Sequence, residues 1–446
     1  PQHYRQWLGS MHAYAADDPV FLAMNARGQR ETGGELGDFC VQCHAPIAVA
    51  LGETKDGLNL DELPQHLKGV TCYACHNVEA VEGTHNNPLR LAMDDILRGA
   101  FDDGVDNGFH EMDYSSFTDG ATLASGDMCG SCHDLVNPAG VHVERTYKEW
   151  LDSFYSRPKV GFPQLVDFPG PGQSCNFCHM PSVRAPVADY AGVLTRDLHD
   201  HRHVGVDVAL TDWPDAEQGP ALLQDQVDHI AEFLDPNVCV GLCVNPAADG
   251  NGTDVKVWLH NELTGHSFPS GAAQDRRLWV ELHAFDGATE VLQSGAVADD
   301  ASIDAAAAAD PMLWLLRDFA YTDEASREPA TMFWEIGYIE SDTLAVAAEA
   351  GLVYDKTTWK SRTWHVDGPV DRATISVEVR PIPFELVDEL VDDGLEPAVK
   401  ERIPTFTLGQ TVREWTPEAA SPTDYEGSCV ESATCFCILA NEDDKC

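Results

Sequence analysis

The sequence predicts an α+β fold, in which a coil- and helix-rich first region is followed by an antiparallel β-sandwich and a short cysteine-rich tail. Helical spacing of apolar residues before residue 236, alternating strand patterns after it, and cysteines gathered near the end of the chain lead to this prediction. At 446 residues the chain is long enough for two or three domains. The predicted domains are residues 1–236, 237–418 and 419–446.

Short helices are predicted at 3–16, 89–99, 145–156 and 220–234. The last one carries apolar residues at helical spacing and ends before Pro236. Strands are predicted at 255–263, 276–285 and 373–382, where β-branched and aromatic residues gather between turn residues. The alanine run at 305–309 predicts a surface loop or a short helix.

The pentapeptide C-x-x-C-H occurs four times in the first region, at 40–44, 72–76, 129–133 and 175–179. Two cysteines at this spacing can add to the two vinyl groups of one porphyrin, and the adjoining histidine then becomes the fifth ligand of its iron. A zinc site or a thioredoxin-like pair is the alternative for a lone C-x-x-C, but neither requires a histidine directly after the second cysteine. The sequence therefore predicts four haem c groups, bonded by Cys40, Cys43, Cys72, Cys75, Cys129, Cys132, Cys175 and Cys178 and ligated by His44, His76, His133 and His179.

The ligand on the opposite side of each iron decides what the protein can do. A sixth protein ligand leaves only outer-sphere electron transfer, whereas an open position permits substrate chemistry. Of 18 histidines, four follow the motifs, so 14 remain as candidates, and the eight methionines show no comparable clustering. This abundance favours histidine on both sides of each iron, and no catalytic residue is predicted. The haem groups are expected to organise the first region.

The composition narrows the classes of partner and the location. With 74 acidic and 28 basic side chains the formal net charge is −46, which disfavours nucleic acid as a partner. A solubilising surface explains the charge, and docking of basic redox proteins is the alternative. No run of apolar residues is long enough to predict a membrane span. The start at Pro1 and the 14 cysteines predict an exported protein, periplasmic or extracellular, whose signal has been removed.

Six cysteines lie outside the haem motifs. Three disulfides are their predicted use, and the spacing leaves all 15 pairings open. A zinc site made by the cysteines of the tail is the alternative. These cysteines are Cys239, Cys243, Cys429, Cys435, Cys437 and Cys446.

Several segments resemble multihaem cytochromes of the cytochrome c554-like group. They are YRQWLGSMHAYAADDPVF, GVTCYACH, NPLRLA, SGDMCGSCHD with ERTYKEW, SCNFCHMP, HDHRHVGVDVALTDWP and GHSFPSGAAQDRRLWVEL, and together they span most of residues 1–415. The resemblance implies a four-haem domain followed by a C-terminal β domain. The final 27 residues match nothing in the group.

The resemblance also implies where the sixth ligands lie. Histidines at the family's positions are His12, His110, His199 or His201, and His266, with His203 as a further neighbour and His142 and His85 in reserve. Five favoured residues for four irons mean that at least one is surplus.

The leading functional hypothesis is an electron carrier outside the cytoplasm that exchanges electrons with redox partner proteins. Some relatives polymerise into conducting filaments, so a homo-oligomer in which one haem takes a ligand from the next subunit is a further hypothesis. The rival is a multihaem oxidoreductase that acts on a small nitrogen or sulfur compound at one open haem. A third hypothesis makes the β-sandwich a binding module.

Overall fold

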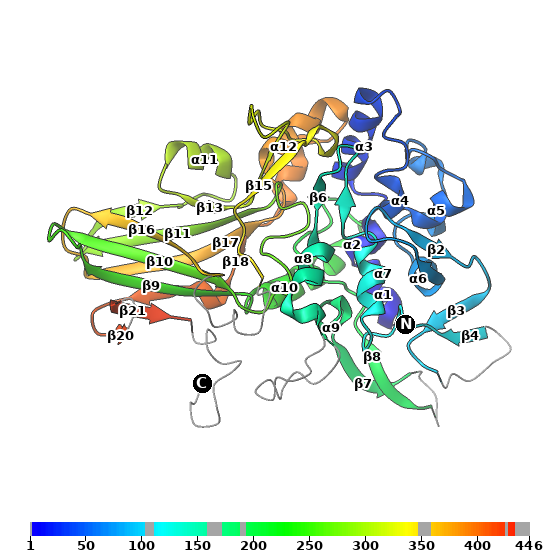
Figure 1. Ribbon diagram of the computed structural model, residues 1–446, viewed down its shortest axis with the longest axis horizontal. Helices are drawn as coiled ribbons and strands as arrows, with labels where there is room; N and C mark the ends of the chain where they lie inside the picture. The colour runs from blue at the N-terminus through cyan, green and yellow to red at the C-terminus, as the bar shows by residue number, and fades with distance from the viewer. Residues whose placement is uncertain are drawn as a thin grey trace.

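The computed structural model describes residues 2–102, 111–157, 172–187, 193–346, 358–423 and 427–432. Helices and small two-stranded sheets occupy one side of the molecule, and two larger antiparallel sheets occupy the other (Figure 1). This mixture of helices and antiparallel sheets confirms the predicted α+β class. Within the described residues, every helix is too short or too polar to cross a bilayer.

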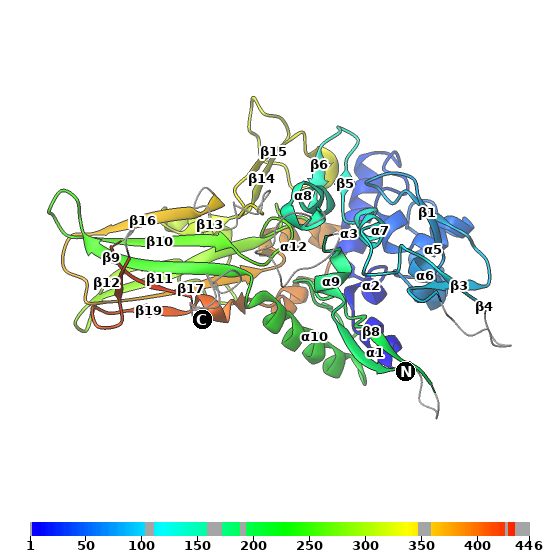
Figure 2. The same ribbon diagram turned by 60° about the horizontal axis from the view of Figure 1, so that its bottom comes forward.

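Before residue 236, the described part of the chain consists of short helices and small two-stranded sheets, both antiparallel and parallel. Its helices are α1 Gln2–Leu8, α2 Met11–Tyr14, α3 Pro19–Glu31, α4 Val41–His44, α5 Pro46–Leu51, α6 Cys72–His76, α7 Ala124–Gly130, α8 Thr146–Asp152, α9 Cys175–His179 and α10 Gly219–Leu234. Its paired strands are β1 Val78–Val81 with β2 Leu89–Leu91, β3 Ile96–Gly99 with β4 Glu111–Tyr114, β5 Leu135–Val136 with β6 His142–Glu144, and β7 Ser182–Pro186 with β8 Thr195–His199. The pair β7–β8 extends away from the body beside α1 (Figure 2).

Two of the four helix predictions agree closely with the structure. Helix α10 covers the segment predicted at 220–234, and α8 covers the start of the one at 145–156. The helix predicted at 3–16 is interrupted at Ser10, whose hydroxyl accepts a hydrogen bond from the Ala13 amide at 3.4 Å and caps α2.

The helix predicted at 89–99 is wrong, because this segment forms β2 and β3. Leu89 and Leu91 lie in a strand that pairs with β1, and the Asp94 carboxylate accepts the Ile96 amide at 3.2 Å to form a turn before β3. Helix α3 was not predicted, although Asp18 and Pro19 supply a standard start. The Asp18 carboxylate accepts the Val20 amide at 3.0 Å.

Two antiparallel sheets make up most of the chain after α10. One has the strand order β16-β10-β9-β21-β20, and the other has the order β12-β11-β17-β18, with β13 beside β11 and β19 beside β17. The bounds are β9 Val238–Pro246, β10 Thr253–Asn261, β11 Arg277–Asp286, β12 Thr289–Ser294, β13 Trp314–Leu316, β16 Lys360–Val366, β17 Arg372–Arg380, β18 Phe406–Thr407, β19 Arg413–Trp415, β20 Ser421–Thr423 and β21 Gly427–Glu431.

Smaller elements lie outside these two sheets. They are the pair β14 Asp318–Tyr321 with β15 Tyr338–Ser341, and the helices α11 Ile303–Ala309 and α12 Phe384–Leu390. The alanine run predicted as a loop or short helix thus forms α11. The strands predicted at 255–263, 276–285 and 373–382 correspond to β10, β11 and β17.

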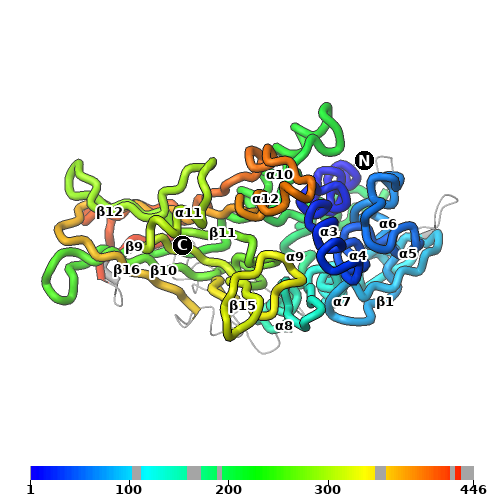
Figure 3. The backbone as a smooth tube through the Cα atoms, turned by 90° about the horizontal axis from the view of Figure 1, so that it is seen from above, coloured from blue at the N-terminus to red at the C-terminus, as the bar shows by residue number. Residues whose placement is uncertain are grey.

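The main hydrophobic core joins the two sheets and continues into the first part of the chain. Leu259 on β10, Leu282 on β11 and Trp364 on β16 are all fully buried in it. Helix α3 contributes Val20 and Met24 to the same core and lies against α12 (Figure 3). A separate cluster around α4 and α5 combines alanines with larger side chains such as Phe21, Ile47 and Leu60.

One disulfide lies among the described residues. Cys243 on β9 and Cys429 on β21 occupy opposite positions in the strand register and are bonded. Cys239 is buried further along β9, with its Sγ 3.7 Å from Glu262 Oε2. The cysteines at 435, 437 and 446 lie outside the described residues, so their predicted use stays a prediction.

Candidate haem-binding sites

Each C-x-x-C-H motif forms a short helical segment. The motifs at 40–44, 72–76 and 175–179 form α4, α6 and α9, and the third motif continues α7, with the His133 amide donating to Cys129 O at 3.1 Å. Because residues three and four apart lie on the same face of a helical turn, both cysteines and the histidine of each motif point to one side. This arrangement suits one porphyrin per motif.

Backbone carbonyls orient three of the motif histidines. The Nδ1 atoms of His44, His76 and His179 lie 2.7, 2.6 and 2.7 Å from the carbonyl oxygens of Ala15, Arg98 and Val204. A carbonyl only accepts, so each Nδ1 donates its proton and Nε2 keeps a free lone pair. This is the tautomer in which a histidine can ligate a metal.

Three of the four motif histidines face a second imidazole. The ring centroids of His76 and His201 are 6.4 Å apart with planes at 13°, and those of His179 and His266 are 6.3 Å apart with planes at 11°. His133 faces His12 at 6.1 Å, with planes at 59°. A metal–imidazole bond of about 2 Å on each side, with each centroid about 1.1 Å behind its nitrogen, gives a separation of about 6 Å. The spacing therefore fits one iron between each pair.

His44 has a different environment. The ring of Phe21 stacks on it, with centroids 3.9 Å apart and planes at 7°. In the described part of the chain, no second histidine ring contacts His44. The first motif thus differs from the other three in what lies near its histidine.

A large and mostly apolar cavity of about 760 Å³ lies between the second and third motifs. The cysteines of both motifs line it, together with His76, His133 and the opposing His12 and His201. Apolar side chains such as Val49, Ala50 and Ala74 also line it. A flat macrocycle would fill this apolar cavity, so the residues present fit haem.

Burial holds these histidines in the neutral form that a metal requires. Desolvation, followed by the charges of neighbouring histidines, lowers the pKa of His12 to about 3. It also lowers the pKa of His179 and of His201 to about 4. Desolvation raises the pKa of the Cys40 and Cys75 thiols to about 12. Neutral imidazoles are the form that ligates iron.

The histidines predicted as sixth ligands have different surroundings in the structure. His201 faces His76, whereas His199 at the end of β8 points toward Gly120, where an added Cβ would lie 3.2 Å from its Cε1. His12 and His266 each face a motif histidine. His110 lies outside the described residues and stays a prediction.

Two further histidines lie beside these pairs. The ring of His3 is 4.5 Å from that of His201, and the ring of His203 is 4.5 Å from that of His12. His3 was not among the predicted sixth ligands. The spacing of His3 and Trp7 on one face of α1, both of which line the cavity, was the pattern that could have identified it.

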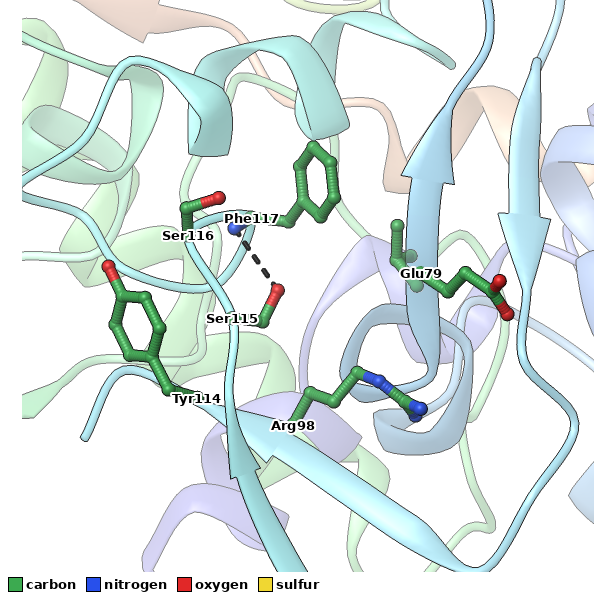
Figure 4. Close-up of a pocket in the computed structure, with 7 residues that line it drawn as sticks. Glu79, Arg98, Tyr114, Ser115, Ser116 and Phe117 are labelled. Carbon is green, nitrogen blue, oxygen red and sulfur yellow. Dashed lines mark hydrogen bonds between the residues drawn. The ribbon is translucent and has the colours of Figure 1, made fainter. Parts of the chain in front are cut away.

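A second cavity of about 500 Å³ lies beside the second motif, between β1 and the end of β4. Arg98, whose carbonyl accepts the His76 proton, lines it with Glu79 and Phe117 (Figure 4). The Phe117 amide donates to Ser115 Oγ at 3.2 Å and shapes the turn at its edge. The Arg98 guanidinium is paired with Asp94 at 2.8 Å.

The repeated motifs and the paired imidazoles define a c-type cytochrome with several haems, which transfers electrons through haem c. Residues 1–77 match the family described as cytochrome c554 and c-prime, and this segment contains the first two motifs. The four motifs make the chain a multihaem c-type cytochrome, and its first 77 residues are similar to the c554 group.

A solved structure shares the fold over nearly the whole chain. It is a penta-heme cytochrome c552 from Thermochromatium tepidum, which is 19% identical, with a TM-score of 0.58 over 93% of this chain and 96% of that one. That protein carries five haems, whereas this chain has four motifs. None of the curated proteins matches the chain.

Proposed function

We propose that the protein is a four-haem electron carrier that works outside the cytoplasm and passes electrons between redox partner proteins. The observation that carries this proposal is that three motif histidines each face a second imidazole at 6.1–6.4 Å. Iron with histidine on both sides has no open position, so it exchanges electrons without binding a substrate.

In this proposal each motif holds one haem c through its two cysteines. The axial pairs are His76 with His201, His133 with His12, and His179 with His266. Bound haem supplies one-electron chemistry at iron, and the protein sets its potential through ligation, burial and hydrogen bonds.

Contacts between motifs support electron transfer along the set. Cys132 lies beside Cys43, and Cys129 lies beside Cys175, so the third motif is adjacent to the first and the fourth. Cys75 of the second motif lies close enough to Cys129 for their charges to interact. The third motif is thus the centre of the proposed electron path.

For the first haem, we propose His142 as the sixth ligand. Its Nδ1 lies 2.6 Å from Asp134 Oδ1, an orientation typical of metal-ligating histidines, and Asp134 is buried. Glu144, two residues along the same face of β6, lies close enough to Cys40 to raise the pKa of its thiol. His110 is the other candidate within the chain.

Two measurements on the purified protein test the proposal. Intact mass should exceed that of the polypeptide by four haem groups, and electron paramagnetic resonance of the oxidised protein should show only low-spin iron. His201→Ala, His12→Ala and His266→Ala should each convert one haem to high-spin iron, and Gln218→Ala on the surface should convert none. A variant series without any spin change would refute the axial pairs.

Location and assembly are finer parts of the same proposal. Export is supported by the disulfide, because disulfides form and persist in oxidising compartments outside the cytoplasm. In a filament, a second copy would supply the sixth ligand of the first haem in place of His142. Low-spin iron that persists in His142→Ala, together with filaments in electron micrographs, would favour that version.

The environment of His44 supports a second candidate function. Its ring contacts Phe21 and, within the described residues, no second histidine. A first haem that is open would bind a small ligand and reduce or oxidise it there, as an oxidoreductase does. A high-spin signal in the native protein that disappears on addition of cyanide would favour this function over that of a carrier.

A further inference from the structure

Helix α8 connects two haem motifs to the loop that carries His266. The Tyr147 amide donates to His133 O at 3.1 Å, so the start of α8 is fixed to the third motif. The indole of Trp150 donates to Gln173 O at 2.8 Å, next to the fourth motif. The helix therefore has a fixed position relative to both motifs.

The third contact of α8 is with the loop between β10 and β11. Glu149 Oε2 accepts the Ser267 amide at 3.2 Å and the Ser270 hydroxyl at 2.7 Å. Thr146 Oγ1 accepts the Gly271 amide at 2.9 Å. The two side chains hold both ends of a five-residue segment that begins directly after His266.

Arg145 keeps the carboxylate of Glu149 in place. Its Nε lies 3.3 Å from Glu149 Oε1, and its Nη2 lies 2.7 Å from Asp318 Oδ2, with all three side chains largely buried. On the other side of the loop, Asn261 Nδ2 donates to the carbonyl of His266 at 2.8 Å. Hydrogen bonds thus hold both polar groups of the peptide that follows this histidine.

We infer that Glu149 is a positioning residue for the sixth ligand of the fourth haem, because it ties the loop of His266 to the helix that holds the third and fourth motifs. The inference rests on the proposed axial pair of His179 and His266. Glu149 does not touch the haem in this proposal, and it acts through the loop, by its hydrogen bonds to the Ser267 amide and the Ser270 hydroxyl. Without its carboxylate, His266 would leave the iron more often, and an external ligand could take its place.

The holoprotein carrying Glu149→Ala tests this inference, with Glu149→Gln and Asp152→Ala as matched controls. The amide oxygen of the introduced glutamine can accept both hydrogen bonds, and Asp152 is an exposed carboxylate on the same helix. In reduced protein, Glu149→Ala should bind carbon monoxide at one haem with an affinity roughly 10–100-fold above that of wild type. Both controls should behave as wild type does. An affinity in Glu149→Ala equal to that in Asp152→Ala would overturn the inference.

His266→Ala separates failure of the inference from failure of the axial pair. If His266→Ala leaves all iron low-spin, then the pair itself is wrong. If His266→Ala produces high-spin iron and Glu149→Ala leaves the carbon monoxide affinity unchanged, then only the role of Glu149 is wrong. Should Glu149→Ala not accumulate as holoprotein, Ser270→Ala removes one of the two bonds, and an unchanged carbon monoxide affinity in that variant would overturn the inference.

Discussion

The haem-bearing part of the chain and the two sheets after it differ in what fills their interiors. The sheets bury large side chains against one another, such as Trp364, Leu282 and Leu259. Between the second and third motifs, in contrast, lies a cavity of about 760 Å³. The second part can therefore be stable through its own packing, whereas the first depends on the cofactor for apolar contacts.

The largest expected effect is loss of structure in the haem-bearing part when haem is not attached. In chain produced without haem attachment, amide exchange of α4, α6 and α9 should be at least about a thousandfold faster than in holoprotein, equal to about 4 kcal/mol of opening free energy. Strands β10, β11 and β17 should keep their protection. Equal protection of α6 in both preparations would contradict the comparison.

Truncation of a core tryptophan tests whether the two sheets are stabilised by their own packing. Trp364 is fully buried and donates its indole proton to Met312 O at 3.0 Å. Trp364→Ala should lower the free energy of unfolding by about 3–5 kcal/mol in chemical denaturation while the absorption bands of the haems stay unchanged. Val291→Ala, at a residue that is 38% exposed, is the control. A change in the haem spectrum of Trp364→Ala would show that the two parts are not separable.

The disulfide should matter for the sheets and not for the haems. Cys243 and Cys429 are separated by 186 residues, so their bond restricts most of the second part when it is unfolded. Replacing both by serine should cost about 2–4 kcal/mol of stability. Midpoint potentials of the haems, measured by redox titration, should not move, and the single variant Cys239→Ser serves as a comparison.

The last effect concerns the partly buried carboxyl of Asp18 at the start of α3. Desolvation raises the pKa of Asp18 from 3.8 to about 7. Between these values the folded state holds more protons than the unfolded state, so stability falls as the pH rises from about 4 to about 7. Asp18→Asn keeps the helix cap and should remove up to about 1.4 kcal/mol per pH unit from this slope. Thermal unfolding across that range, with the exposed Asp61→Asn as control, measures it.

Features that depend on short stretches of sequence could be predicted. The four motifs fix cysteine and histidine positions without reference to the fold, and the strands β10, β11 and β17 follow from alternation within single segments. The helix predicted at 89–99 failed because its leucines pair with β1, a contact that the local pattern does not contain. For the same reason, sequence spacing could not choose between His199 and His201. That choice depends on how β8 lies against the second motif.

The contact between Cys243 and Cys429 shows the same limit. Six cysteines allowed 15 pairings, and the register of β9 against β21 selects this one. His3 was overlooked because no motif surrounds it. Asp18 and Pro19, in contrast, are a typical start of a helix, so α3 could have been predicted from the sequence.

The position of His266 also has a consequence for how the protein matures. His179 and His266 lie far apart in the chain, and β10, which leads into the loop of His266, pairs with β9 and β16. If His266 is the second ligand as proposed, a porphyrin could be attached at Cys175 and Cys178 before this histidine has reached its folded position. The fourth haem would then have an open sixth position until the sheets assemble. Its conversion to low-spin iron would therefore coincide with the folding of the whole chain.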